Sequence, residues 1–288
     1  MRSAKSAPNF LTFDVEEWYM ANYDSDVFSR YPAAASRIEW ETDRLLAICD
    51  ETGHKATCFC VGRLAQERPE IIRKFHRQGH EIASHGYSHG LVYRMTPEAF
   101  KADLNKSIRI LEDCTGGRIK GFRAPSWSVT AEILPWFYRI LEEAGIEYSS
   151  SVYPAWTYLF GIPGFPERIH RPQVGGQRTS VYEVPQVLTS FLGQKVGFSG
   201  GFFLRFFPTW FIKSMLSRKN HQGMPAFIYV HPREIDPKAG RLPLKRIDRL
   251  VHYWNVAGTE AKLRKILACD RFEFLTIGAY LRRLEAQQ

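Results

Sequence analysis

Short apolar segments alternate with amphipathic segments over most of the chain, and this alternation constrains the fold more than any other feature. In one such segment, Phe100, Leu104, Ile108 and Leu111 follow the 3.6-residue period of a helix. Strands that alternate with helices predict a parallel sheet, either open or closed into a barrel. The expected strands are 9–13, 56–61, 80–83, 119–122, 146–149, 181–187, 226–230 and 272–276.

Helix boundaries are predicted from local start and stop signals. Ser36 and Glu39 have the spacing of a capping box, and Gly53 is expected to end that helix. Pro69 and Pro97 are placed to open two further helices, because proline is favoured in the first helical turn. The expected helices end near residues 53, 79, 116, 145 and 268.

The chain of 288 residues is long enough to bury a full hydrophobic core. It contains no repeat, low-complexity stretch or clear linker, so we expect one domain over residues 1–288. Residues 155–180, rich in glycine, proline and aromatic residues, are expected to form a long surface excursion. An apolar content of 44% with 24% charged residues excludes a disordered, collagen-like or multi-span membrane chain.

The formal net charge of +9 suits an anionic partner, such as nucleic acid, a membrane surface or an acidic polymer. The charge is concentrated in residues 205–249, where ten basic residues face three acidic ones. No recognised nucleic-acid motif accompanies it, and we predict no nucleic-acid partner.

The cysteine pattern and the chain's hydropathy point to a cytoplasmic protein. The five cysteines are odd in number and never spaced as C-x-x-C, so free thiols in a reducing compartment are expected. The first residues resemble no signal peptide, and no apolar run is long enough to span a membrane. A peripheral position at the inner membrane face is the second expectation.

Residue types that support metal and acid–base chemistry follow several of the expected strands. His85 and His89 have the i, i+4 spacing that lets two imidazoles face one metal ion. In extended backbone, period-2 alternation puts Asp14 and Glu16 on one face, where a cation would relieve their repulsion. Exposed or core histidines and a solvated acidic loop are the alternative interpretations.

Two further candidate side chains, those of Arg123 and His231, also lie next to the ends of expected strands. Arg123 follows a strand and can hold a carboxylate bidentately, whereas His231 ends an apolar strand and can transfer protons near neutral pH. A surface arginine and a core histidine are the simpler interpretations of each residue alone. Because residues that follow parallel strands meet at one rim of a β/α barrel, we expect these groups to form one site.

With these residues assembled, the sequence resembles the polysaccharide deacetylases of carbohydrate esterase family 4, with the nodulation-type deacetylase homology domain. Three motifs carry the resemblance: T-F-D-V-E at 12–16, S-H-G-Y-S-H at 84–89 and R-A-P-S-W at 123–127. The core motifs lie in 10–154 and 226–237. The segment H-P-R-E-I-D-P at 231–237 resembles a subgroup associated with exopolysaccharide biosynthesis loci.

The resemblance implies an α/β fold, a distorted (β/α)7-type barrel with a parallel sheet, and one divalent metal ion. Zinc is the first expectation for the metal, with cobalt, nickel or manganese as alternatives. Glu16, His85 and His89 would be its ligands, and Glu17 is a less favoured alternative to Glu16. The chain departs from the family in lacking a clear fourth motif, so either Glu183 or Asp236 is a candidate to tune His231.

The implied activity is hydrolysis of the N-acetyl groups of N-acetylhexosamine units, in a polysaccharide or its lipid-linked precursor. This is the chemistry of hydrolases that act on carbon–nitrogen bonds other than peptide bonds. Asp14 would be the general base, Arg123 would orient it, and His231 would be the general acid. The backbone N–H of Trp127 would bind the oxyanion.

Residues 200–216 are rich in aromatic side chains and have two interpretations. They are expected to form core and pocket wall. Alternatively, they form an interfacial segment in which Arg205 and Lys213 meet lipid headgroups and bring the enzyme to a lipid-linked glycan.

Two other functions are compatible with the same motifs. A metal-dependent amidohydrolase acting on a small cyclic amide or ureide would share the fold and the metal site. A weakly active glycan-binding relative would explain the missing fourth motif. The sequence does not indicate an oligomeric state.

Overall fold

The computed structural model describes residues 6–22, 35–157 and 161–287, and they form two compact units that interleave along the chain. The first unit takes in the described residues up to Phe13 together with Glu17–Thr57 and Gly197–Gln288. The second takes in Asp14–Glu16 and Cys58–Val196. Strand β1 (Asn9–Val15) contributes residues to both units.

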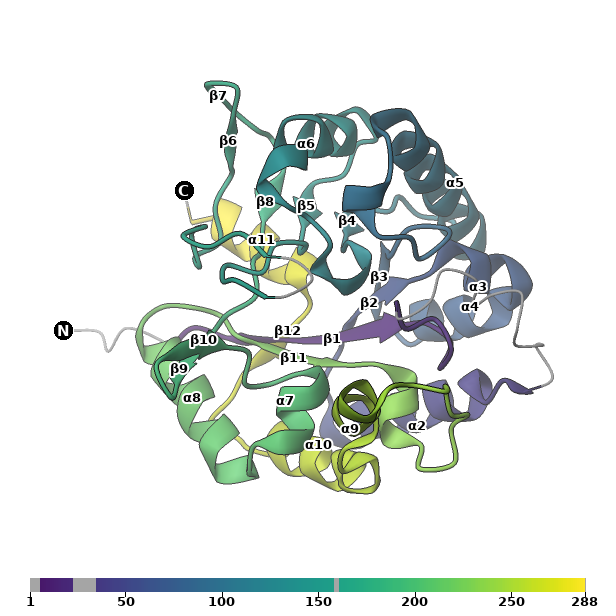
Figure 1. Ribbon diagram of the computed structural model, residues 1–288, viewed down its shortest axis with the longest axis vertical. Helices are drawn as coiled ribbons and strands as arrows, with labels where there is room; N and C mark the ends of the chain where they lie inside the picture. The colour runs from purple at the N-terminus through teal and green to yellow at the C-terminus, as the bar shows by residue number, and fades with distance from the viewer. Residues whose placement is uncertain (1–5, 23–34, 158–160, 288) are drawn as a thin grey trace. The chain divides into compact units, whose positions relative to one another are not determined.

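A parallel sheet organises the second unit, with its strands in the order β1-β2-β3-β4-β5-β8 (Figure 1). The register aligns Ser84 of β3 with Phe122 of β4, and Phe122 with Ser149 of β5. The strands of this sheet that follow β1 are β2 (Thr57–Cys60), β3 (Glu81–Ser84), β4 (Gly121–Phe122), β5 (Tyr148–Ser149) and β8 (Tyr182–Glu183).

Helices connect these strands and bury the faces that the sequence predicts. Thr96 caps the longest helix by accepting a hydrogen bond from the Ala99 N–H at 3.2 Å, and Gly116 ends it in the left-handed conformation. The helices are α3 (Gly62–Glu67), α4 (Pro69–Arg77), α5 (Pro97–Thr115) and α6 (Leu134–Glu143), with 3₁₀ turns η2 (Val92–Arg94), η3 (Pro125–Trp127) and η4 (Ala131–Ile133).

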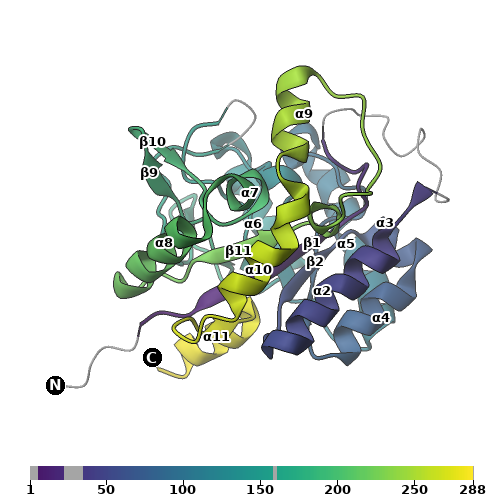
Figure 2. The same cartoon turned by 90° about the horizontal axis from the view of Figure 1, so that it is seen from below.

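In the first unit, β1 lies between β11 (Phe227–Val230) and β12 (Phe274–Leu275), and both pair with it in parallel. Phe13 is the register partner of Val230. The helices of this unit (Figure 2) are α2 (Ile38–Thr52), α7 (Gly201–Phe206), α8 (Thr209–His221), α9 (Arg246–Tyr253), α10 (Thr259–Leu267) and α11 (Ile277–Glu285), with 3₁₀ turns η5 (Pro232–Ile235) and η6 (Val256–Gly258).

Several elements differ from the predictions. The Ser36–Glu39 capping box does not form, because α2 begins at Ile38 with Arg37 at the N-cap position, and the Ser36 hydroxyl donates to the Glu17 carboxylate. The strand expected over 181–187 is confined to β8, and helix α3 was not predicted.

The surface excursion holds a small antiparallel hairpin of β6 (Gln173–Val174) and β7 (Gln177–Arg178), while its residues 158–160 lie outside the described residues. A second hairpin, of β9 (Thr189–Phe191) and β10 (Gln194–Val196), follows β8.

The aromatic segment 200–216 folds into α7 and the first part of α8. Leu204, Phe207 and Ile212 are buried, as expected for core, whereas Phe206 and Trp210 are exposed. Arg205 is only 3% exposed, so the suggestion that it reaches lipid headgroups is wrong. Its guanidinium is retained in the interior by the Glu234 carboxylate at 3.0 Å.

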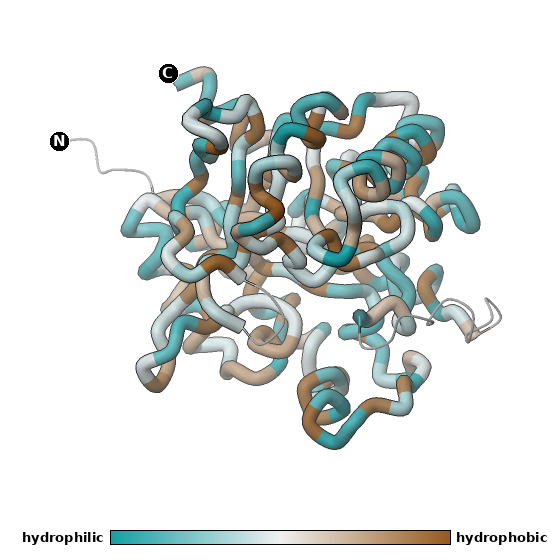
Figure 3. The backbone as a smooth tube through the Cα atoms, turned by 45° about the horizontal axis from the view of Figure 1, so that its top comes forward, coloured by the Kyte–Doolittle hydropathy of each residue, from teal (hydrophilic) through white to brown (hydrophobic). Residues whose placement is uncertain are grey.

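Hydropathy along the backbone alternates between hydrophilic and hydrophobic within the helices (Figure 3). Among the described residues, no helix combines the length and apolar character needed to cross a membrane. All five cysteines are free, as predicted.

The predicted α/β fold built on a parallel sheet is confirmed. The prediction of a single domain stays a prediction, since each of the two units is compact by itself.

We expect Gly121→Ala to destabilise the second unit. A Cβ at Gly121 would overlap the ring of Tyr148 on the neighbouring strand β5, and overpacking of a core costs about 1–3 kcal/mol. The matched control is Gly117→Ala, where a Cβ meets no atom within 4 Å. Urea denaturation should lower the midpoint of the first variant only, and equal midpoints would contradict this packing.

Candidate metal and catalytic site

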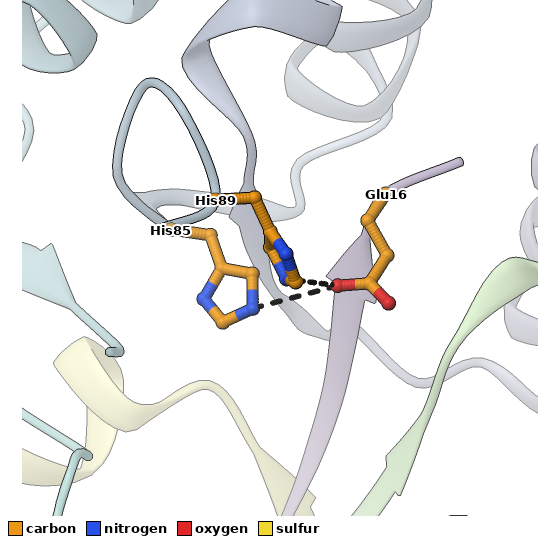
Figure 4. A group of neighbouring side chains, drawn as sticks. All are labelled: Glu16, His85 and His89. Atoms are coloured by element: carbon orange, nitrogen blue, oxygen red, sulfur yellow. Dashed lines mark ion pairs between the residues drawn. The ribbon is translucent and has the colours of Figure 1, made fainter. Parts of the chain in front are cut away.

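Three buried side chains of the second unit direct their ligand atoms toward one another (Figure 4). Glu16 follows β1, whereas His85 and His89 lie on the loop after β3. The Glu16 Oε2 atom is 2.7 Å from His89 Nε2 and 3.7 Å from His85 Nε2, and the three ligand atoms lie within 4.8 Å of one another. Two imidazoles and one carboxylate are the ligand set of an open, catalytic zinc site.

The ring of His85 is held in the form that binds metal. Its Nδ1 lies 2.7 Å from the Arg123 carbonyl oxygen, which can only accept, so Nδ1 carries the proton and Nε2 presents a lone pair. Burial, and then the neighbouring His89, lower the pKa of His85 well below its usual value. A neutral His85 with Nε2 directed at Glu16 fits a divalent cation.

The loop that carries both histidines is fixed by Asp103 of α5. The Asp103 carboxylate accepts hydrogen bonds from the backbone N–H groups of Tyr87 and Ser88, at 2.7 and 3.0 Å. His89 itself has φ 57°, a left-handed conformation that is uncommon for a residue other than glycine and often marks a functional site. Asp103 was not predictable from the sequence, because nothing in the spacing links an acid on this helix to the preceding loop.

Arg123 and Asp14 form a fully buried ion pair, with 2.6 Å between Arg123 Nη1 and Asp14 Oδ1. The guanidinium lies over the ring of Phe59 at 4.0 Å and donates a further hydrogen bond to Ser150. Removing one partner of such a pair typically costs about 3–5 kcal/mol, because the other charge is left buried. The side chain of Asp14 is therefore held in one orientation.

A serine-rich turn after β5 supports the Arg123 segment. Ser151 accepts from the Ala124 N–H at 3.0 Å. Glu183 accepts from the backbone N–H groups of Ser151 and Val152, at 2.7 and 2.9 Å, and from the hydroxyl of Tyr138. Glu183 thus positions this turn, a function that the sequence analysis did not assign to it.

Trp127 lies on the short turn η3 within the same unit. Ser126 and Trp127 both have positive φ, at 55° and 49°, which indicates a strained turn. The Trp127 N–H donates to the Ala124 carbonyl at 3.0 Å, so it would have to leave that partner to bind an oxyanion.

Glu16 and Glu17, the two candidate ligands, have different partners. Glu16 faces the two histidines, whereas Glu17 belongs to the first unit and accepts a hydrogen bond from Ser36. Alternation along the extended chain separates the two side chains.

His231 follows β11 in the first unit and is oriented by Glu234. His231 Nδ1 is 3.0 Å from Glu234 Oε2, and the same carboxylate oxygen accepts from the His231 N–H. Burial would raise the Glu234 pKa, but the Arg205 guanidinium and the His231 imidazole hold it well below its usual value. A carboxylate at Glu234 therefore fixes the orientation of the His231 ring.

The earlier candidates for tuning His231 are both wrong. Glu183 binds the serine turn of the second unit, and Asp236 pairs with Arg37. The residue that performs this function lies three positions after His231, within the motif H-P-R-E. The 3₁₀ turn η5 brings the two side chains together, and a short turn of this kind was not predicted.

Within the first unit, His231 directly follows Val230 of β11, the register partner of Phe13 on β1. A cavity of about 250 Å³ in the first unit is lined by residues that follow His231, among them Arg233, Asp236 and Arg241.

Glu41 on α2 is a further buried carboxyl group of the first unit, and neither of its oxygens has a hydrogen-bond partner among the described residues. Burial, and then the charges of Asp236 and Glu17, raise its pKa to about 8. Glu41 is therefore protonated in the folded protein at neutral pH, whereas an exposed glutamate is ionised.

Comparison with known protein families gives this geometry a context. The family model for polysaccharide deacetylases matches residues 10–149, which contain Asp14, Glu16, both histidines, Arg123 and Trp127. Nearly half of the chain is therefore similar to the polysaccharide deacetylase family. A second model, described only as a domain of unknown function (DUF3473), matches residues 150–282, which include His231.

Relatives of the deacetylase domain have been named in fungi and bacteria. A peptidoglycan deacetylase-like protein of Gibberella zeae is 28% identical over 190 residues, covering 61% of this chain and 55% of that protein. A peptidoglycan deacetylase of Helicobacter pylori is 33% identical over 94 residues, 32% of each chain. A chitooligosaccharide deacetylase of Azorhizobium caulinodans is 32% identical, covering 31% of this chain and 44% of that protein. The chain thus spans at most about half the length of these curated relatives.

Solved structures share the α/β fold of this chain. A Mycobacterium smegmatis protein, provisionally described as a polysaccharide deacetylase, aligns with a TM-score of 0.63 at 19% identity, covering 99% of this chain and 93% of that one. A family 4 carbohydrate esterase from Streptomyces lividans aligns with a TM-score of 0.51 at 15% identity, over 94% and 93% of the two chains. The relatives named as deacetylases are hydrolases, the enzyme class that the sequence predicts.

Zinc binding by alanine variants should show whether Glu16 or Glu17 is the metal ligand. We expect Glu16→Ala and His89→Ala to weaken zinc binding by more than about 100-fold, because each removes one ligand of three. The control is Glu17→Ala, which should bind zinc as the unaltered protein does. Calorimetric titration of metal-stripped protein measures this directly, and loss of binding in the control alone would move the ligand to Glu17.

The raised pKa of Glu41 predicts a pH dependence of stability. Between pH 4.5 and about 8 the folded state binds the Glu41 proton and the unfolded state does not, so the free energy of unfolding falls by up to about 1.4 kcal/mol per pH unit from this group. Glu41→Gln removes this dependence. Compared with the unaltered protein, the variant should gain stability in urea denaturation at pH 8 and lose that advantage below pH 4.5. An equal difference at both pH values would exclude this assignment.

Proposed function

We propose that the protein is a metal-dependent hydrolase that removes N-acetyl groups from N-acetylhexosamine units of a glycan. The observation that carries this proposal is the buried Glu16–His85–His89 cluster, which shares one unit with the Asp14–Arg123 ion pair. Metal ligands and a fixed carboxylate are the two components that hydrolysis of an amide by water requires.

Glu16, His85 and His89 would hold one divalent ion, for which zinc is the first choice given the ligand types. When bound, the ion would lower the pKa of a water molecule and polarise the acetamide carbonyl. The chain's own contribution is the rigid presentation of the ligands. The Arg123 carbonyl fixes His85, and Asp103 fixes the loop that carries both rings.

Asp14 would be the general base that takes a proton from the attacking water. Arg123 keeps Asp14 oriented, and the buried position of both groups excludes competing solvent. The Trp127 N–H would bind the developing oxyanion after exchanging its Ala124 partner.

His231 would be the general acid that gives a proton to the departing amine. Its support is its position directly after β11 and the contact of its ring with the Glu234 carboxylate. The Glu234 carboxylate on Nδ1 leaves Nε2 as the atom that donates the proton. The products would be acetate and a free amino sugar.

The substrate class is inferred from the relatives. Those named as peptidoglycan and chitooligosaccharide deacetylases act, by their names, on glycans that contain N-acetylhexosamine. For this chain we propose a polysaccharide or its lipid-linked precursor, in keeping with the exopolysaccharide-associated motif at 231–237. We retain a cytoplasmic location as part of the proposal.

Acetate release from N-acetylglucosamine oligomers by zinc-loaded protein tests the proposed function. Asp14→Asn should lower the rate by at least about 100-fold, the usual contribution of a general base, while zinc binding is retained. The control is Asp113→Asn, an exposed carboxylate on α5. Turnover of small ureides without acetate release would instead favour the amidohydrolase alternative, and glycan binding without turnover would favour the glycan-binding one.

A further inference from the structure

Helix α9 presents an apolar stripe to solvent. Ile247, Leu250 and Trp254 are 77%, 56% and 44% exposed, and their spacing of three and four residues places them on one face. Apolar residues at this spacing normally face a protein core. In the described part of the chain, this face of α9 contacts no core.

The stripe is held in place from the opposite side of the helix. Arg205 donates hydrogen bonds to the carbonyl groups of Val251, His252 and Trp254, at 3.1, 3.0 and 2.8 Å. Its remaining partner is the buried Glu234 carboxylate. His252 is buried on that side, so the orientation of α9 is fixed and its apolar face is directed outward.

Cations flank the stripe. Lys245, Arg246 and Arg249 are all exposed, and no ion pair to any of them is found among the described residues. Asp248, the acidic residue of this helix, is half-buried. The α9 face, defined by Ile247, Leu250 and Trp254 with these three cations, is therefore both apolar and positively charged.

The exposed end of α7 lies next to the α9 face. Asn255 donates a hydrogen bond to the Arg205 carbonyl at 3.3 Å, which holds the residue after Trp254 against the end of α7. Phe206, at that end, is 44% exposed. The apolar surface therefore continues beyond α9 within the same unit.

We propose that the α9 face docks on a membrane surface that carries anionic lipid headgroups. A short helix with apolar side chains on one face, cations beside them and a tryptophan at its end is suited to lie in the plane of the lipid–water interface. The cores of protein interfaces are depleted of charge, whereas this face has as many cations as apolar side chains. This inference is independent of the proposed activity.

Binding of this kind combines two contributions. Each cation near an anionic surface raises the partition coefficient by a factor of about five, and this electrostatic contribution decreases as the salt concentration rises. The apolar side chains add a contribution that salt does not remove. Together they predict reversible binding.

Co-sedimentation of the full chain with lipid vesicles tests the proposal. We expect binding to vesicles containing phosphatidylglycerol, weaker binding at high salt, and little binding to phosphatidylcholine alone. Replacement of Ile247, Leu250 and Trp254 by serine should lower the partition coefficient by at least about 10-fold. Replacement of Lys245, Arg246 and Arg249 by glutamine should lower it by about 100-fold and reduce its salt dependence.

The matched control replaces exposed apolar residues outside the α9 face. Trp156→Ser with Leu192→Ser, at residues 75% and 88% exposed in the second unit, should bind vesicles like the unaltered protein. Equal loss in this control, or unchanged binding in the α9 serine variant, would overturn the proposal. A third result would also overturn the proposal: the unaltered protein forms a concentration-dependent dimer, does not bind vesicles, and loses the dimer in the α9 serine variant. A second copy of the chain would then occupy the α9 face. Unchanged circular dichroism and thermal midpoint establish that each variant is folded.

Discussion

The buried ion pair of Arg123 and Asp14 is the interaction on which the organisation of the second unit's site depends. A guanidinium without solvent is stable only with a carboxylate partner and well-placed acceptors, and here Asp14 and Ser150 provide them. The backbone carbonyl of the same arginine holds His85, so one residue fixes both the carboxylate and a metal ligand. The serine turn and Glu183 then hold the segment that follows Arg123.

The first unit repeats this arrangement with different residues. Arg205 is buried against Glu234, and Glu234 in turn orients His231. In both units a buried arginine neutralises an acid, and the functional side chain is positioned through that pair. Such pairs contribute little net stability, but they hold a charged group in one orientation where water cannot reorganise it.

The sequence was sufficient to predict the features that depend on local patterns. The period of α5, its Thr96 cap and its terminal Gly116 are encoded within a few residues of one another, and the structure has all three. The residues that follow the strands were also predictable, because chain order places them at strand ends. Asp103, by contrast, acts on a loop that precedes it by many residues, and only the packing of α5 reveals its role. Glu234 was missed because the η5 turn that brings it to His231 has no strong sequence signature.

One guanidinium joins two regions that otherwise have separate tasks. Arg205 binds Glu234 with one edge and the carbonyl groups at the end of α9 with its other nitrogens. The side chain that neutralises Glu234 beneath the His231 ring is thus the same one that satisfies the last carbonyl groups of the surface helix. Replacing Arg205 would therefore leave both a buried carboxylate and a helix end without their partner.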